Sequence, residues 1–446
     1  MMKHLASTTA MAVLLAGVAN AGGHLAFAPG EGDFNWDSYN SFAEQYDLSG
    51  QSLSITGPWT GQDKDLVDSV IAYFEEATGA EVEYSGSDSF ESDFVIAAEA
   101  GNPPQMAVFP QPGLMADMAR QGNLVALPDG TGDWLRENYA AGESWVSLGT
   151  VDDTMYGFPY KIDVKSLVWY VPEAFEEAGY EVPETLEALK ELTDQIVADG
   201  GTPWCIGLGS GAATGWPATD WVEDMMLRTQ PPETYDAWVA NELPFDSPEV
   251  VNAIEEFGYF ARNDDYVSGG AEAVASTDFR DSPGGLFEVP PQCYMHKQAT
   301  FIPTFFPEGT ELGLDVDFFY FPAYEGEDLG QPVLGAGTLF VRTEESDVTA
   351  AFLDFLQTPI AHELWMAQSG FLTPYTEVNP DVFPTDTQRA LNEILTNATT
   401  FRFDGSDLMP GEIGAGAFWT GMVDYVTGED AEAVGAAIQE RWEAIQ

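Results

Sequence analysis

The sequence has 446 residues, of which 15 are Lys or Arg and 74 are Asp or Glu, giving a formal net charge of −59 at pH 7. Nucleic acids and anionic membrane surfaces would repel such a chain, so neither is an expected partner. The content of 45% hydrophobic and 13% aromatic residues is typical of a globular protein, and the length allows two domains of ordinary size.

The N-terminus has the pattern of a signal peptide. Residues 1–4 form a short basic start, and residues 5–18 form a run of small and apolar residues. Residues 19–21 have small side chains at the first and third positions, as signal peptidase requires. The apolar run is too short to remain in a bilayer, and no later uncharged stretch approaches the length of a membrane span. We therefore expect residues 1–21 to be removed and the mature protein to be exported to the periplasm.

Residues 22–50 show no clear periodicity, so we expect them to form a linker or a surface-packed extension. Regular structure is expected to begin with an alternating strand at 53–56. Strands and helices then alternate. The next strands are expected at 81–84 and 106–109, with helices that begin at Asp63, Ser89 and Leu114 and end at Gly79, Gly101 and Gly122.

This alternation predicts an α/β fold built on a parallel sheet with crossover helices. Ligands of such sheets bind beyond the carboxyl ends of the strands. The polar turns at 59–63, 85–89 and 110–112 directly follow three predicted strands, so they are the first candidates for a binding site. A further strand is expected at 166–170, and helices at 185–199, 220–227, 248–260, 349–356, 361–368, 388–395 and 431–445.

Cys205 and Cys293 are the only cysteines. In an exported protein such a pair favours a disulfide, which would remove on the order of 4 kcal/mol of unfolded-state freedom. Two thiols without histidines at ligand spacing make a poor metal site. We therefore expect neither a metal nor a cofactor.

Motifs of secreted hydrolases are incomplete. His362 and Glu363 begin like a zinc-protease helix, but Met366 stands where the second histidine would be. The glycine-rich run at 207–211 has its serine one place too late for a nucleophile elbow. Paired carboxylates for glycoside hydrolysis are compatible with so acidic a chain, so a secreted glycoside hydrolase or lyase stays an alternative.

Eight short segments together resemble the solute-binding proteins of bacterial ABC carbohydrate importers, the class that contains the maltose-binding protein. The similarity extends from Leu53 over the whole mature chain and is closest to the periplasmic α-glucoside-binding type. The segments are GPW at 57–59, GNPPQ at 101–105, YGFPY at 156–160, GWPATDW at 215–221, ATFIPTFF at 299–306, GAG at 335–337, SGFLTP at 369–374, and 409–419.

The resemblance implies a type II periplasmic-binding-protein fold, with two α/β lobes and a ligand cleft between them. The expected N-terminal lobe comprises 50–161 plus 333–374, and the expected C-terminal lobe comprises 165–332 plus 376–446. The implied function is that of a receptor, not an enzyme. It would act as a monomer that captures a mono- to trisaccharide, an α-glucoside, by hinge closure and delivers it to the permease subunits of an importer.

Sugars present apolar ring faces and a rim of hydroxyls, so their sites combine aromatic platforms with polar groups. Trp59, Trp216 and Trp419 are the stacking candidates, each with the alternative of an ordinary core tryptophan. Trp419 matches a motif position that stacks on sugar in the family. Phe306 replaces the tryptophan that is usual in its segment, which puts the strength of that platform in doubt.

The polar candidates begin with Lys161 and Asp163, which alternate along an extended segment in a chain with only 15 basic residues. Lys165 joins them, and a surface ion pair is the alternative. Further candidates are the loop residues Asp88, Gln111 and Asp220, the glycines Gly335 and Gly337, which serve either close approach of the ligand or the hinge, and Arg402, which contacts either the ligand or Asp404. The cations keep open a second ligand class, an acidic or sulfonated sugar or another polar solute.

Overall fold

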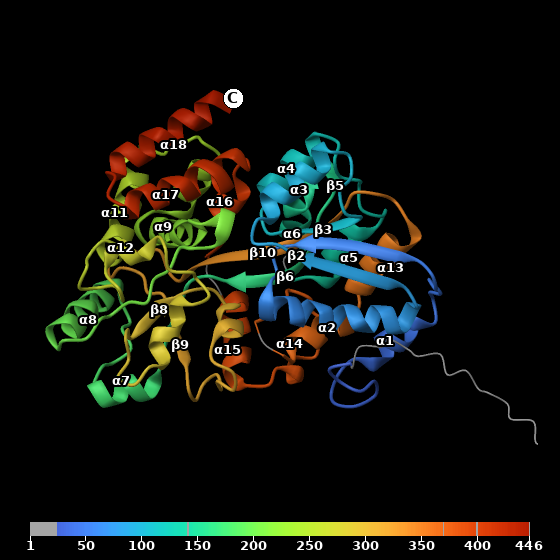
Figure 1. The fold of residues 1–446 in the computed structure, drawn as a ribbon, viewed down its shortest axis with the longest axis horizontal. Coiled ribbons are helices and arrows are strands. Elements are labelled where there is room, and N and C mark those ends of the chain that lie inside the picture. The colour runs from blue at the N-terminus through green and yellow to red at the C-terminus, as the bar shows by residue number, and fades with distance from the viewer. Residues whose placement is uncertain (1–24, 141, 369, 398–399, 446) are drawn as a thin grey trace, which may run out of the picture.

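The computed structural model describes residues 25–140, 142–368, 370–397 and 400–445. The predicted signal peptide lies outside these residues. The described chain forms two lobes that lie side by side in Figure 1, with the C-terminal helices over the left lobe and the first strands in the right lobe. Within the described part of the chain, none of the helices is both long and apolar enough to span a membrane.

The N-terminal lobe is built on a parallel sheet, as the alternation of strands and helices predicts. Strand β1 (Ser52–Gly57) pairs in parallel with β2 (Glu81–Gly86) on one side and with β3 (Met106–Phe109) on the other. Residues of β1 and β3 that face the core are fully buried. The crossover helices are α2 (Gly61–Thr78), α3 (Phe90–Glu99) and α4 (Pro112–Arg120).

Two long strands connect the lobes. β10 (Pro332–Arg342) is buried along its entire length and pairs antiparallel with β6 (Phe158–Val164) and with β3. Its first residues pair in parallel with β11 (Thr400–Phe403). β10 therefore passes from one lobe into the other, and Figure 1 shows it and β6 running between the two halves.

A third connection lies at residues 372–376, where Leu372 bridges Ile162 of β6. His362 of α14 (Pro359–Met366) fixes this segment, because its Nδ1 lies 2.9 Å from Thr373 Oγ1 and its Nε2 lies 2.8 Å from Leu356 O. Burial lowers the pKa of His362 to about 3, so the ring stays neutral. The resemblance implies that the chain crosses between the lobes near residues 160–165, 333–337 and 373–376, and this division of the chain into lobes stays a prediction.

The C-terminal lobe contains a small antiparallel sheet in which β7 (Leu167–Tyr170) pairs with β8 (Met295–Lys297) and β9 (Asp317–Tyr320). The longer helices of this lobe are α7 (Pro172–Ala178), α8 (Leu186–Ala198), α9 (Trp216–Thr229), α11 (Pro248–Ala261), α17 (Trp419–Val426) and α18 (Ala431–Ile445). Of these, α17 packs on α9, and α18 packs on α17 and α11. Cys205 and Cys293 form the predicted disulfide, with Cα atoms 5.5 Å apart and a sequence separation of 88.

The remaining helices, strands and turns complete the described chain. The helices are α5 (Thr131–Asn138), α6 (Gly142–Leu148), α10 (Pro232–Val239), α12 (Ala271–Val274), α13 (Asp347–Leu356), α15 (Asp386–Asn397) and α16 (Gly405–Leu408). The hairpin strands are β4 (Thr150–Val151) and β5 (Thr154–Met155), and the 3₁₀ turns are η1 (Gly211–Ala213), η2 (Ser282–Phe287), η3 (Ile302–Phe305) and η4 (Pro380–Val382). A π-helical segment, η5 (Glu412–Phe418), precedes α17.

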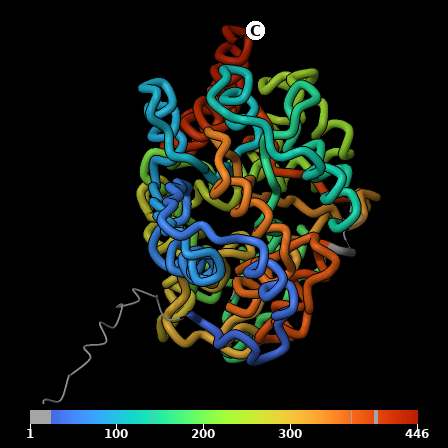
Figure 2. The backbone as a smooth tube through the Cα atoms, turned by 90° about the vertical axis from the view of Figure 1, so that its right-hand side faces the viewer, coloured from blue at the N-terminus to red at the C-terminus, as the bar shows by residue number. Residues whose placement is uncertain are grey.

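The N-terminal extension differs from the sequence expectation. Residues 22–50 are predicted to be a linker or a surface extension, but α1 (Trp36–Ala43) forms within them. Trp36, Tyr39 and Phe42 lie three residues apart, so one helix face carries three rings into the core beside α2 and α14. Figure 2 shows these first segments, in blue, wrapped on the lower part of the molecule, with the C-terminal end at the top.

Candidate functional site

A cavity lies between the lobes, with about 900 Å³ of space free of protein atoms, part of it open to solvent. The wall from the N-terminal lobe is made by residues that follow the three parallel strands, as the carboxyl-end rule predicts: Pro58, Trp59, Ser87, Asp88, Pro110 and Gln111.

Aromatic rings line the cavity from both lobes. Trp216 opens α9, is half-buried, and packs edge-on against Phe279 with ring centroids 4.9 Å apart. Trp419 opens α17 and is also part of the lining. The two loops approach each other closely at Gly215, where φ is +119° and a Cβ would come within 2.3 Å of Trp419 O, so only glycine fits there.

Trp59 has two environments. It is only 6% exposed, and its ring packs edge-on against Trp365 of α14 with centroids 5.0 Å apart, as a core tryptophan would. It also lines the cavity. Trp59 therefore contacts both the cavity and the core of the N-terminal lobe. Its position is compatible with stacking on a ligand and with the role of an ordinary core tryptophan.

Lys161 and Asp163 on β6 form a buried ion pair, with Nζ 2.8 and 2.7 Å from the two carboxylate oxygens. Thr300 Oγ1 donates to Asp163 Oδ1 at 2.9 Å. The ammonium also lies 5.5 Å from the ring centroid of Phe301, a favourable cation–π geometry. The two side chains lie on one face of β6, as the alternation in sequence predicts, and both line the cavity.

Lys165, just after β6, is the cation of a second buried cluster. Its Nζ lies 2.8 Å from Asp220 Oδ1, bonds to Asp404 Oδ2, and lies 5.4 Å from the ring centroid of Trp216. Oxygens of Asp220, Glu223 and Asp404 come within 4.8 Å of one another. Lys165 thus supplies positive charge where three carboxylates converge.

The carboxyl groups around Lys165 do not titrate alike. Burial raises the pKa of Asp220 to about 8, an effect that Lys165 offsets only in part and the charge of Asp404 increases. Burial also acts against the ionised form of Asp404, but Lys165 and hydrogen bonds from Ser406 and Asp407 outweigh it, so the pKa of Asp404 is lowered. One ammonium therefore keeps one carboxylate firmly ionised.

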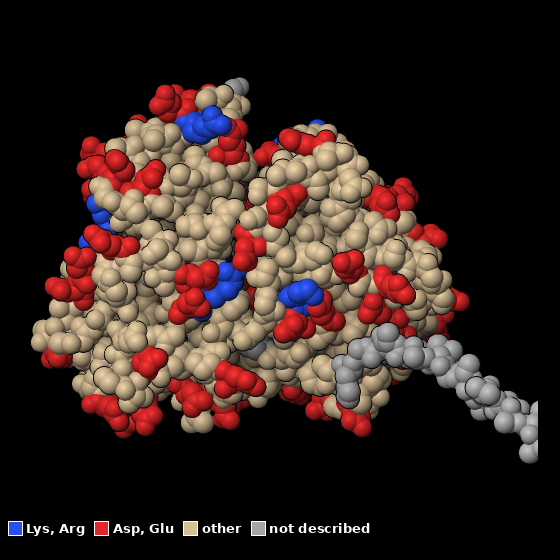
Figure 3. Space-filling model, viewed as in Figure 1, with Lys and Arg blue, Asp and Glu red and all other residues tan. Residues whose placement is uncertain are grey.

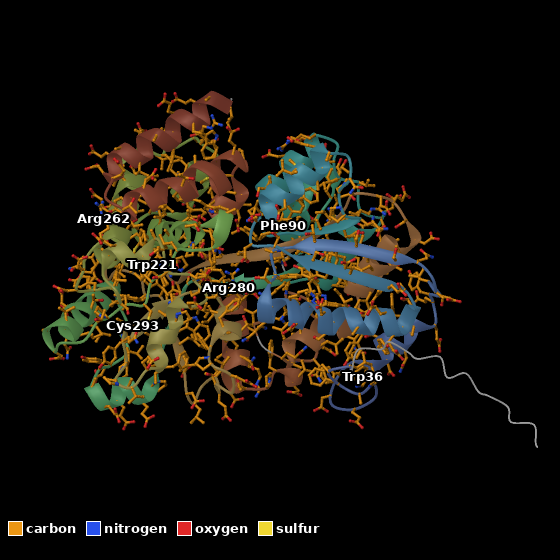
Figure 4. The ribbon with its side chains drawn as sticks, in the orientation of Figure 1. Trp36, Phe90, Trp221, Arg262, Arg280 and Cys293 are labelled. Atoms are coloured by element: carbon orange, nitrogen blue, oxygen red, sulfur yellow. A yellow bond between two sulfur atoms is a disulfide. The ribbon has the colours of Figure 1, made fainter. Side chains whose placement is uncertain are left out.

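An ion pair joins the lobes across the mouth of the cavity. Arg280 of the C-terminal lobe lies 2.5 Å from Asp88 Oδ1 in the loop after β2, and Thr60 Oγ1 donates to the same oxygen at 3.0 Å. Figure 4 places Arg280 between the two lobes, with Phe90 at the start of α3 beyond it. In the described conformation this ion pair therefore links residues on the two sides of the cavity.

The family described as bacterial extracellular solute-binding proteins matches residues 58–363. The chain belongs to this family. The alpha-glucosides-binding periplasmic protein AglE of Rhizobium meliloti is 61% identical over 429 residues, which cover 95% of this chain and 94% of AglE. The osmoprotective compounds-binding protein GgtB of Synechocystis is 41% identical over 88% of this chain and 92% of GgtB.

Solved structures show the same fold. The solute receptor AcbH, described as preferring β-D-galactopyranose, superimposes with a TM-score of 0.76 at 18% identity, over 89% of this chain and 100% of AcbH. Maltose-bound MalE3 of T. maritima superimposes with a TM-score of 0.70 at 16% identity, again over 89% of this chain and 100% of that one. At such identities the similarity establishes the two-lobed α/β architecture of this solute-binding protein.

Most residues predicted from the sequence of this solute-binding protein to contact the ligand line the cavity, but four do not. Asp220 lies behind the wall, bonded to Lys165. Arg402 pairs at 2.6 and 2.9 Å with Asp236, neither with a ligand site nor with Asp404. The structure places Phe306 and Gly335 away from the lining as well.

Packing explains the positions of these last two residues. The Phe306 ring contacts Phe287 and Trp169 with centroids 5.1 and 5.7 Å away, so it is part of the core of its lobe. At Gly335 a Cβ would come within 2.3 Å of the Phe401 ring, so this glycine serves strand packing. Gly337, two residues along β10, does line the cavity, together with Trp59, Asp88, Gln111, Lys161, Asp163, Trp216 and Trp419.

The sequence reasoning missed several lining residues of this solute-binding protein. Asp63 was expected to cap α2, but Thr60 holds the N-cap position and Asp63 faces the cavity from the first turn. Arg280 is one of few arginines, and the scarcity argument that singled out Lys161 would have found it. The other missed residues are Glu91, Ser210, Phe279, Phe301, Thr338, Ser406 and Asp407.

Proposed function

We propose that this solute-binding protein captures a neutral sugar of one to three rings, an α-glucoside, between its lobes and delivers it to the permease of an ATP-driven importer. Removal of residues 1–21 would leave the mature receptor in the periplasm. One observation carries the neutral-sugar proposal: the interlobe cavity is walled by aromatic rings from both lobes, and its cations are already paired with carboxylates.

The aromatic walls suit pyranose rings. Trp59 comes from the N-terminal lobe, and Trp216 and Trp419 come from the C-terminal lobe, so a ring lying between them can present its apolar CH faces to indole or benzyl surfaces on either side. A ligand that contacts both lobes binds the closed conformation better than the open one, and this difference in affinity drives closure.

The charges favour a neutral ligand over the acidic or sulfonated alternative. Lys161, Lys165 and Arg280 each form an ion pair within the protein, so none is left to compensate an anion. An anionic sugar would also meet an excess of carboxyl groups, in a molecule whose visible face in Figure 3 shows acidic side chains scattered over both lobes. The lining carboxyl groups beyond those ion pairs belong to Asp63, Glu91 and Asp407.

Similarity to AglE supports the α-glucoside class, because the identity extends over nearly the whole of both chains. GgtB, whose name gives osmoprotective compounds as its ligands, is less similar to this chain, at 41% identity. Relatives of both kinds are binding proteins, which supports a receptor over a glycoside hydrolase or lyase.

Calorimetry on protein freed of retained ligand by unfolding and refolding tests the proposal. Methyl α-D-glucoside and maltose are expected to bind, methyl β-D-glucoside at least about tenfold more weakly, which corresponds to about 1.4 kcal/mol, and glucuronic acid not detectably. Replacing Trp216 by alanine should weaken binding about tenfold or more through the loss of a stacking surface. Trp134→Ala, which removes a half-buried ring outside the cavity, is the matched control.

Binding of glucuronic acid without binding of any neutral glucoside would replace the proposed ligand by the acidic class. Turnover of a labelled oligosaccharide, instead of its stoichiometric retention, would show an enzyme.

A further inference from the structure

Four buried polar atoms in the lining lack a hydrogen-bond partner within the described part of the chain: Asp63 Oδ1, Gln111 Oε1, Thr338 Oγ1 and Trp419 Nε1. An unpaired buried polar atom costs about 1–3 kcal/mol, and native proteins leave few of them. Their concentration around one cavity indicates that the missing partners are atoms of the ligand.

Asp63 is the most demanding of the four. Its side chain is 8% exposed, and the nearby Thr304 hydroxyl, which lowers the pKa of the carboxyl group, donates its proton to Phe301 O at 2.9 Å. The nearest cations are Lys161 and Arg280, and each is bonded to another carboxylate. The free Oδ1 therefore has no donor of its own.

A structural role in α2 does not account for this carboxyl group. Thr60 occupies the N-cap position, and Asp63 stands in the first turn, with its unpaired oxygen buried instead of bonded to a helix N–H. Burial raises the pKa of Asp63 to about 6, with Lys161 and Arg280 acting in the opposite direction and Asp163 adding to the rise. The charge of Asp63 also contributes to raising the pKa of Tyr84 of β2, whose hydroxyl accepts a hydrogen bond from Trp59 N.

Gln111 offers a second acceptor from the same lobe. Its Nε2 donates to Glu91 Oε1 at 2.8 Å, which fixes the orientation of the amide and leaves Oε1 as the free atom. The two unpaired atoms, Asp63 Oδ1 and Gln111 Oε1, are thus both hydrogen-bond acceptors. A matching ligand must therefore present hydrogen-bond donors to this lobe.

We propose that Asp63 and Gln111 are specificity-determining residues, each accepting a hydrogen bond from a hydroxyl group of the captured glycoside. The inference rests on the proposed function, because it assumes a glycoside in the cavity. A ligand without a hydroxyl at the matching position leaves a buried acceptor unpaired, so the site rejects it by about 10- to 100-fold for each group.

The test is a double-mutant cycle between protein and ligand. Methyl α-D-glucoside and its 2-, 3-, 4- and 6-monodeoxy derivatives are titrated into the wild-type protein, Asp63→Asn, Asp63→Ala and Gln111→Leu. In the wild type, at least two deoxy positions are expected to weaken binding about 10- to 100-fold. In Asp63→Ala and in Gln111→Leu, which remove the acceptor, one of those positions should lose most of its effect, and the position should differ between the two variants.

Asp65→Asn is the matched control, since this aspartate is exposed two residues further along α2. A pH series separates ligand contact from a structural role. A hydroxyl donating to the carboxylate favours its ionised form, so wild-type affinity should fall as the pH drops below about 6. That pH dependence should be absent in Asp63→Asn, because the amide does not ionise. This variant keeps the shape of the side chain, so it also serves as the test if Asp63→Ala fails to fold.

Deoxy effects that are the same in the wild type and in the variants would overturn the inference while leaving the proposed function intact. Failure of the wild type to bind methyl α-D-glucoside and maltose would overturn the proposed function itself.

Discussion

Replacing Lys165 by methionine should destabilise the protein strongly at alkaline pH and much less in acid. The substitution keeps the length of the side chain and removes the ammonium from between Asp220 and Asp404, all three side chains being less than 10% exposed. Breaking a buried pair by removing one partner costs about 3–5 kcal/mol, because the remaining charge stays buried without compensation.

The pH dependence follows from the same carboxyl groups. Without Lys165, the folded-state pKa values of Asp220 and Asp404 lie above those of the unfolded chain, so their contribution to stability is present in acid and is lost as pH rises. If the folded variant holds one extra proton, its stability falls by about 1.4 kcal/mol per pH unit. Between pH 5.5 and 8 this amounts to about 3 kcal/mol, which agrees with the expected loss.

Urea unfolding of ligand-free protein at pH 5.5 and pH 8 measures both quantities. Lys64→Met is the matched control, because Lys64 pairs with Asp68 on the surface, with side chains 39% and 41% exposed, and should cost well under about 1 kcal/mol. A loss for Lys165→Met below about 1 kcal/mol at pH 8, or an equal loss at both pH values, would refute the assignment of Lys165 as the cation on which these carboxylates depend.

Two further predictions concern the links within and between lobes. Replacing Cys205 and Cys293 by alanine should lower the free energy of unfolding by about 4–5 kcal/mol, as expected for a loop of 88 residues; urea curves that coincide with those of the wild type would contradict this. Arg280→Gln and Asp88→Asn should each weaken binding of every sugar by the same factor of about 2–5, since their partly exposed ion pair, with side chains 20% and 45% exposed, links the lobes at about 0.5–1 kcal/mol. Calorimetry decides, because a factor that differs between ligands would assign Arg280 to ligand contact instead.

The predicted elements of the fold agree with the structure where local patterns are strong. The apolar run at 106–109 is β3, and the helical spacing of leucines after Thr185 gives α8, whose Ala188 N–H donates to the Thr185 side chain. The pattern fails at α1, where glycines and asparagines hide a helix that is stabilised by burying three aromatic rings against α2 and α14. Tertiary packing supplied what local propensity did not.

The candidate site was only partly predictable, because the chain offers 74 carboxyl groups and no local rule selects among them. Arg402 illustrates the difficulty: its neighbour Asp404 was the expected partner, yet Arg402 bonds to Asp236, 166 residues away. Asp404 instead bonds to Lys165, 239 residues away. Asp63, expected to be a helix cap, instead places in the cavity one buried carboxyl oxygen that has no hydrogen-bond partner among the described residues.

By itself, the sequence determined the acidic composition, the alternation of strands and helices, the cysteine pair and the loops after β1, β2 and β3, since periodicity and turn residues act over a few neighbouring positions. Only the tertiary structure decided which cations meet which carboxylates and which polar atoms remain unpaired in the cavity. Both the ion pairs and the unpaired atoms involve side chains that the fold brings together from distant parts of the sequence. Their electrostatic energies change steeply with distance and burial, so no local sequence rule can give them.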